Sequence, residues 1–209
     1  MIKKVRPLKL NIIKFLKMNK AIPNIIFMLL AVIGSAIAQN EKEKPRLSGA
    51  VIIAEALSGK LVSVDQGSFK RFSLDPEKAI DHFLFYHSAD WSPNCRKFTP
   101  ELIKFYNKAK KENANFEVIF VSRDDSEKEM LNYMKEQKMP WPAVRFEELQ
   151  KLKFLKQISG RGVPNLAVVD SRGLILSQSY KGGTKYLGPD PPLKAFQKLI
   201  GSKENGPKN

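Results

Sequence analysis

The stretch FYHSADWSPNCRKFTPEL, Phe85–Leu102, carries the strongest indication of how this chain folds. Its start overlaps a compact apolar run, Ile80–Tyr86, which predicts a buried central strand. From Cys95 to Lys110 the apolar side chains recur at helical spacing, on one stripe that contains Cys95, Phe98, Leu102, Phe105, Tyr106 and Ala109. The stretch therefore predicts a strand that passes through a short turn at Trp91 into an amphipathic helix.

Segments on both sides extend this pattern. Upstream, the apolar stretches Ala50–Ala54 and Lys60–Val64 flank Ser58-Gly59, which predicts a β-hairpin. Downstream, the sequence predicts a strand at Phe116–Val121, a helix capped by Ser126 with Glu129, a short helix through Leu149, Leu152 and Leu155, a strand at Leu166–Val169, a turn at Asp170–Gly173, a returning strand at Leu174–Leu176 and a last helix through Leu193, Phe196, Leu199 and Ile200.

This order of elements predicts an α/β fold. A strand, a helix and a second strand in succession form a parallel pair joined by a right-handed crossover. The returning strand near the end adds an antiparallel edge. We therefore expect a mixed central sheet with helices on both faces and an N-terminal β-hairpin extension.

Three segments resemble the tryparedoxin and nucleoredoxin branch of the thioredoxin-like family. In that branch a strand ends in a Trp-Cys-x-x-Cys turn that opens a helix, followed by Arg and a Phe-Thr-Pro-Glu-Leu run. The matching residues here are Trp91, Cys95, Arg96, Phe98, Thr99, Pro100 and Leu102. Met139–Val144 and Gly162–Leu166 resemble two later segments of the family, and in thioredoxin folds the proline that corresponds to Pro164 is cis. The resemblance covers residues 47–200 and implies a thioredoxin fold.

The chain departs from the family at the first active-site cysteine. Ser92-Pro93-Asn94-Cys95 stands where the family has Cys-x-x-Cys, so the attacking thiol is missing. Thiol–disulfide exchange needs a thiolate, which a helix N-terminus helps to form. A serine hydroxyl is not ionised near neutral pH and forms no disulfide. We expect Ser92 instead to cap the helix that follows, which contributes about 1 kcal/mol.

Cys95 matches the family's resolving cysteine, and its place on the apolar stripe predicts an inward, inert thiol. A hydrolytic triad of Ser92, His87 and Asp90 is disfavoured, because three neighbours in sequence rarely adopt that geometry. One cysteine and two histidines are too few for a zinc site, and there is no Gly-rich phosphate loop. We therefore expect no metal and no cofactor.

The resemblance implies a binding surface that needs no cysteine. It comprises Trp91, Pro93, Asn94, Val163 and Pro164, with the Val163 backbone beside the active-site turn, where it would pair with an extended substrate segment. The first hypothesis is a peptide- or protein-binding module without exchange activity. A monothiol oxidoreductase using Cys95 and a structural protein of the cell envelope are the alternatives, so the sequence leaves open whether the chain is an enzyme.

Composition and charge narrow the class of partner. The chain has 209 residues, of which 43% are hydrophobic, enough for one domain with a core. Its formal charge is +15, but residues 1–38 hold seven of the 36 basic residues and none of the acidic ones. The remaining basic residues alternate with acidic ones, which does not favour a nucleic-acid partner. Because the chain has one cysteine, it can form no intramolecular disulfide. We also expect the protein to be a monomer.

The N-terminus has the three parts of a secretory signal. Basic residues precede the apolar run Ile25–Ala38, which ends in Ala36-Ile37-Ala38 and is followed by a polar segment. Residues 1–38 are therefore predicted as a signal peptide, with Met18 as an alternative start. A linker at 39–46, a thioredoxin-like domain at 47–200 and a disordered tail at 201–209 follow. We expect export to a periplasm or the outside, with no membrane span after cleavage, since the run is short for a bilayer.

Overall fold

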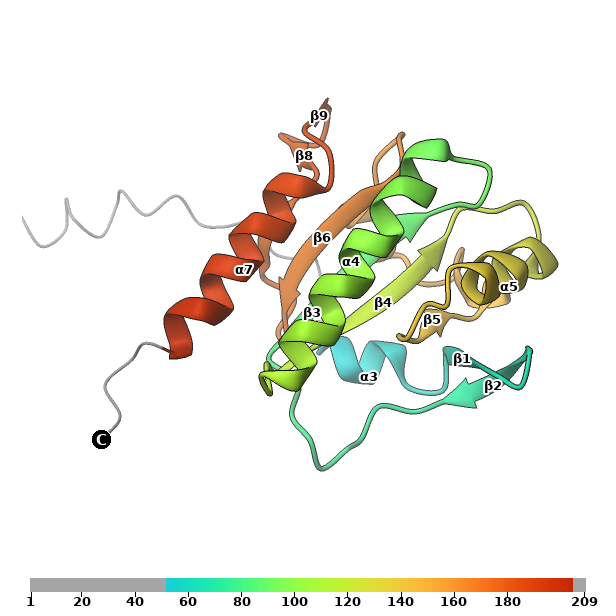
Figure 1. Cartoon of the computed structure of the whole chain (residues 1–209), viewed down its shortest axis with the longest axis horizontal. Coiled ribbons are helices and arrows are strands. Elements are labelled where there is room, and N and C mark those ends of the chain that lie inside the picture. The colour runs from blue at the N-terminus through green and yellow to red at the C-terminus, as the bar shows by residue number, and fades with distance from the viewer. Residues whose placement is uncertain (1–51, 205–209) are drawn as a thin grey trace, which may run out of the picture. The chain divides into compact units, whose positions relative to one another are not determined.

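The computed structural model describes residues 52–204, with the side chains of 52–201 (Figure 1). Its elements are α3 (Ile53–Leu57), β1 (Leu61–Asp65), β2 (Ser68–Phe72), β3 (His82–Ser88), α4 (Pro93–Lys111), β4 (Phe116–Ser122), α5 (Glu127–Glu136), β5 (Ala143–Val144), the 3₁₀ helix η1 (Phe146–Glu148), α6 (Leu155–Ile158), β6 (Asn165–Asp170), β7 (Ile175–Gln178), β8 (Tyr180–Lys181), β9 (Lys185–Tyr186) and α7 (Asp190–Glu204). The main sheet has the order β2-β1-β5-β4-β3-β6-β7, and β8 pairs with β9.

Strand β3 is the centre of the sheet and positions the site. All seven of its residues are buried, and it pairs with β4 in parallel and with β6 in antiparallel orientation. Side chains alternate between the faces of a strand. Leu84 and Tyr86 pack into the core under α4, whereas Phe83 and Phe85 pack into a second core on the opposite face. One strand therefore supplies residues to two separate environments.

The helices divide between these two faces. The core under α4 also contains Met130 and Tyr133 from α5 and Phe196 from α7, so these three helices cover one face. Ile53 of α3 and Leu155 of α6 belong to the other core. Figure 1 shows α4 lying across the centre of the sheet and α7 beside β6, which it contacts. The two crossovers β3-α4-β4 and β4-α5-β5 use the first face, and the return from β5 to β6 uses the second.

The predicted α/β fold, with a mixed central sheet and helices on both faces, is confirmed. The N-terminal hairpin is present, but β1 and β2 form it, with Gln66 and Gly67 at positive φ in its turn. The segment predicted as its first strand is helical instead from Ile53 to Leu57. These two side chains are four residues apart and both are buried. Residues at this spacing share one face of a helix as well as one face of a strand, so the sequence pattern fits either element.

Other boundaries differ from the sequence-based expectations. Of the short helix predicted through Leu149, Leu152 and Leu155, only Leu155 is helical, at the start of α6, and a non-helical segment separates α6 from η1. Helix α7 continues to Glu204, beyond the predicted domain boundary at residue 200. The small sheet of β8 and β9 was not predicted. The predicted signal peptide and linker, residues 47–51 and residues 205–209 lie outside the described residues. Within 52–204, no helix combines the length and apolar character that crossing a bilayer requires.

Candidate functional site

The turn between β3 and α4 is built around Ser92. This residue has extended backbone geometry, and its Oγ accepts a hydrogen bond of 3.3 Å from the backbone N–H of Cys95. Pro93 occupies the first turn of the helix, where a missing N–H costs nothing. Ser92 is therefore the N-cap of α4, as the sequence predicts, and it is 5% exposed.

Contacts with two charged side chains, Asp124 and Arg96, hold Asp90, which precedes this turn. The N–H of Asp90 donates to Asp124 Oδ1 at 2.7 Å, which ties the turn to the end of β4. Arg96 forms an ion pair of 2.9 Å with Asp90 and also donates to its carbonyl oxygen at 2.7 Å. Burial raises the pKa of Asp124, while hydrogen bonds from Ser122 and from the Asp90 backbone oppose this shift. The turn is thus fixed from both sides.

Cys95 lies behind the turn with none of its surface exposed, and its thiol is free. Its carbonyl oxygen accepts a 2.8 Å hydrogen bond from Thr99 Oγ1. Thr99 in turn contacts the hydroxyls of Tyr86 and Tyr133 at 2.9 and 2.8 Å, and Ser88 bonds to both tyrosines at 2.9 Å. We call Tyr86, Ser88, Thr99 and Tyr133 the hydroxyl cluster. It satisfies its own polar atoms inside the core.

The hydroxyl cluster is uncharged. Burial raises the pKa of Tyr86 well above its usual value, and the neighbouring Tyr133 raises it further. Burial also raises the pKa of Tyr133. Neither phenol ionises near neutral pH, so the surroundings of Cys95 on this side are polar but neutral.

The loop before β6 reaches the start of α4. The Val163–Pro164 peptide bond is cis, as the resemblance implied. Pro164 is buried beneath the surface, and with Asn94 and Phe98 it lines a cavity of about 270 Å³ that Tyr186 also borders. Tyr186 Oη donates to the Pro164 carbonyl at 2.7 Å. Asn94 and Pro164, far apart in sequence, thus meet in one cavity.

Sequence reasoning missed the residues that hold this loop. Tyr180 Oη accepts a hydrogen bond of 2.6 Å from the N–H of Gly162, and its ring packs against Gly160 so closely that a Cβ there would overlap it. Tyr180 and Tyr186 face each other with ring centroids 5.2 Å apart. One sequence feature could have predicted this hairpin: the Gly182-Gly183 pair between the two tyrosines is typical of a tight turn. Both glycines have positive φ in the structure.

Trp91 forms the outer rim of the turn. It is 62% exposed, and its Nε1 donates to the carbonyl of Arg123 at 3.2 Å. Pro93 and Asn94 are also exposed, whereas Val163 is half-buried. Trp91 does not line the cavity beside Pro164. The predicted binding residues thus surround the start of α4 but divide between an exposed aromatic rim and a small cavity.

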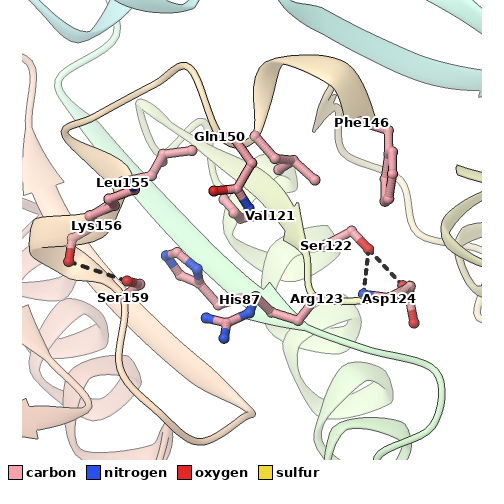
Figure 2. Close-up of a pocket in the computed structure, with 11 residues that line it drawn as sticks. His87, Val121, Ser122, Arg123, Asp124, Phe146, Gln150, Leu155, Lys156 and Ser159 are labelled. Atoms are coloured by element: carbon pink, nitrogen blue, oxygen red, sulfur yellow. Dashed lines mark hydrogen bonds between the residues drawn. The ribbon is translucent and has the colours of Figure 1, made fainter. Parts of the chain in front are cut away.

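The two histidines lie away from this turn. His82 packs edge-on against Phe196 near the far end of β3. His87 is on the face of β3 opposite to α4, where it lines a separate cavity with Arg123 and Gln150 (Figure 2). It therefore cannot serve Ser92 as a base from this side of the sheet, and the hydrolytic triad is not formed. Among the described residues, no cluster of His, Cys, Asp and Glu could hold a metal ion.

Comparisons with known proteins show which proteins this chain resembles. The family model described as thioredoxin-like matches residues 81–175. Human nucleoredoxin is 34% identical over 125 residues, 59% of this chain and 27% of that protein, so the chain spans about a quarter of this curated relative. Tryparedoxin II from C. fasciculata is 34% identical, with 64% of this chain and 84% of that chain covered and a TM-score of 0.49. Tryparedoxin from Trypanosoma brucei is 26% identical, with coverages of 75% and 98% and a TM-score of 0.52.

Proposed function

Because the chain belongs to the thioredoxin-like family, in the redox branch related to nucleoredoxin and tryparedoxin, we propose that it is a binding module without dithiol–disulfide exchange. The single observation that carries this proposal is the Ser92 hydroxyl at the start of α4, bonded to the Cys95 N–H. This hydroxyl occupies the position from which, in the family, a cysteine thiolate attacks a disulfide. The partner is an extended segment of peptide or protein.

Loss of exchange follows from the chemistry of these two positions. A mixed disulfide forms when a thiolate attacks a disulfide sulfur, and Ser92 offers no sulfur. Cys95 has no exposed surface, so a bulky disulfide cannot reach its Sγ without opening of the turn. Complete burial of Cys95 argues equally against a monothiol oxidoreductase.

The binding surface is supported by groups that do not depend on sulfur. The backbone N–H and C=O of Val163 form no hydrogen bond within residues 52–204, although the loop on either side is held by Tyr180 and Tyr186. Free backbone groups on a fixed loop can pair with an extended segment as a strand edge does. The exposed ring of Trp91 adds an apolar contact at the rim of the same turn.

The loss of exchange is tested by reduction of insulin disulfides with dithiothreitol. We expect the full chain to give the rate of the no-protein control, and Ser92→Cys to accelerate reduction, because it rebuilds a dithiol at a helix N-terminus. Ser126→Cys is the matched control, since Ser126 caps α5 with the same type of hydrogen bond but has no cysteine three residues on. Turnover by the unmodified chain that Cys95→Ala abolishes would contradict the proposal.

Peptide binding is tested with fluorescently labelled, S-carboxymethylated insulin B chain as an extended probe that cannot exchange disulfides. We expect saturable binding that Trp91→Ala weakens severalfold. Ile52→Ala removes a comparably exposed apolar side chain just before α3 and should leave the affinity unchanged. Equal affinities of the two variants, or no binding of the probe, would refute the surface.

We also propose export of the chain, to a periplasm or the outside. The support is the order of basic residues, the apolar run Ile25–Ala38 and the polar residues after it. N-terminal sequencing of the protein from its own cells should begin at Gln39. A sequence that begins at Met1 or Met18 would show that the segment is retained and would contradict cleavage.

A further inference from the structure

A second site lies on the opposite face of β3 from Ser92 and Cys95. Because side chains alternate along the strand, His87 points away from α4 and toward α6. There it lines a cavity of about 330 Å³ together with residues from β4, η1 and α6. This volume falls at the lower end of the range for small-molecule sites.

The floor of this cavity holds an unpaired polar side chain. His87 is 1% exposed, and neither of its ring nitrogens has a hydrogen-bond partner within residues 52–204. A buried polar group without a partner is costly, and most such groups in proteins are satisfied. Burial, with a further contribution from the charge of Arg123, lowers the pKa of His87 to about 3, so the neutral ring offers one donor and one acceptor.

Two cations, Arg123 and Lys156, line the cavity. Arg123 Nη1 donates to the Gly160 carbonyl at 3.3 Å, which orients the guanidinium group and leaves its other N–H groups available. Figure 2 shows the His87 ring between the Arg123 guanidinium group and the Gln150 amide. The planar guanidinium group of an arginine can bind a carboxylate or a phosphate through two parallel hydrogen bonds. These are therefore the two anions to consider.

The remaining walls select between these two anions. Val121, Phe146 and Leu155 line the cavity and give it apolar surface beside the polar floor. Asp124 also lines it, but its two oxygens already accept hydrogen bonds from Asp90 N–H and Ser122 Oγ. The charged side chains that line the cavity are Arg123, Lys156 and Asp124, whose formal charges sum to +1. A net charge of +1, neutral donors and apolar walls suit a singly charged acid with an apolar body better than a phosphate.

We propose that this cavity, the His87 cavity, binds a small organic carboxylate, with the carboxylate on Arg123 and His87 and its apolar body against Phe146 and Leu155. His87 donates one N–H to the ligand, and Gln150 supplies a second neutral donor. The site is separate from the turn at Ser92 and does not depend on the proposed peptide binding. The same chemistry is offered by a free acid and by the C-terminal residue of a polypeptide.

The test uses phenylacetate, its neutral analogue phenylacetamide and N-acetylphenylalanine, with the ring nitrogen resonances of the two histidines as readout. The chain has two histidines, and His82 at the other end of β3 serves as internal reference. We expect phenylacetate to shift the His87 signals and not those of His82, and phenylacetamide to bind much more weakly. Whichever of the two carboxylates binds more tightly identifies a free acid or a polypeptide C-terminus as the source.

Two matched variants separate recognition from general charge. Arg123→Gln should weaken phenylacetate binding about tenfold, because it removes one charge-assisted contact. Arg172→Gln removes the same charge at the turn after β6, beside the far end of β3, and should leave the affinity unchanged. Unchanged His87 signals with every probe, equal binding of phenylacetamide, or equal affinities of the two variants would each overturn the proposal.

Discussion

Replacement of Ser92 by alanine should destabilise the protein by about 1–2 kcal/mol. The lost cap alone costs about 1 kcal/mol. The hydrogen bond from the Cys95 N–H to Ser92 Oγ is long, 3.3 Å, so the contribution of the cap alone should lie at the lower end of the range of about 1–2 kcal/mol. However, Cys95 is completely buried and Ser92 is 5% exposed, so water cannot replace the lost acceptor easily. A buried N–H left without a partner adds to the cost of the cap.

The control is Ser126→Ala, which removes the cap of α5. Ser126 Oγ accepts from the Glu129 N–H at 3.2 Å, but this bond is exposed, so water replaces it and the cost should stay near 0.5 kcal/mol. Urea unfolding at 25 °C measures both variants against the parent. With an m-value of about 2 kcal/mol per molar urea, the midpoint should fall by about 0.5–1 M for Ser92→Ala. A Ser92→Ala midpoint equal to or above that of Ser126→Ala would refute the reasoning.

Three further outcomes are expected. Cys95 should react with 5,5′-dithiobis(2-nitrobenzoate) only after unfolding; rapid labelling of the native chain at neutral pH would contradict its burial. The free energy of unfolding should fall as the pH drops from about 6.5 toward 3, because the unfolded chain protonates His87 while the native chain, with its pKa near 3, does not; His87→Gln should flatten this dependence in urea titrations. Gly160→Ala should cost about 1–3 kcal/mol, because the new Cβ overlaps the Tyr180 ring. Gly201→Ala in α7 should not destabilise, because its new Cβ has no atom within 4 Å among the described residues.

The turn around Ser92 could be predicted because its determinants are local. Helical spacing located α4, and a serine at the start of that helix has one obvious structural role. The inward position of Cys95 followed from the same spacing. These parts depend on contacts within one or two turns of the chain.

The parts that could not be predicted depend on distant contacts. Ile53 and Leu57 satisfy a strand or a helix pattern over five residues, and packing against the sheet decides between them. Strands β8 and β9 have two residues each, too few for a periodic signal, yet Tyr186 from this hairpin borders the cavity at Pro164. The apolar run in β3 predicted a buried strand, but not that a cavity would open on the face that His87 occupies.

The hydroxyl cluster behind Cys95 limits what a restored dithiol could do. In Ser92→Cys, the second step of exchange requires Cys95 to give up its proton before it attacks. Phenols with raised pKa values and aliphatic hydroxyls cannot take that proton near neutral pH. The proton would have to leave through solvent, so resolution of the mixed disulfide would be slow and would accelerate with hydroxide concentration. Recovery of fast turnover would therefore require a proton acceptor inside the core as well as the missing sulfur.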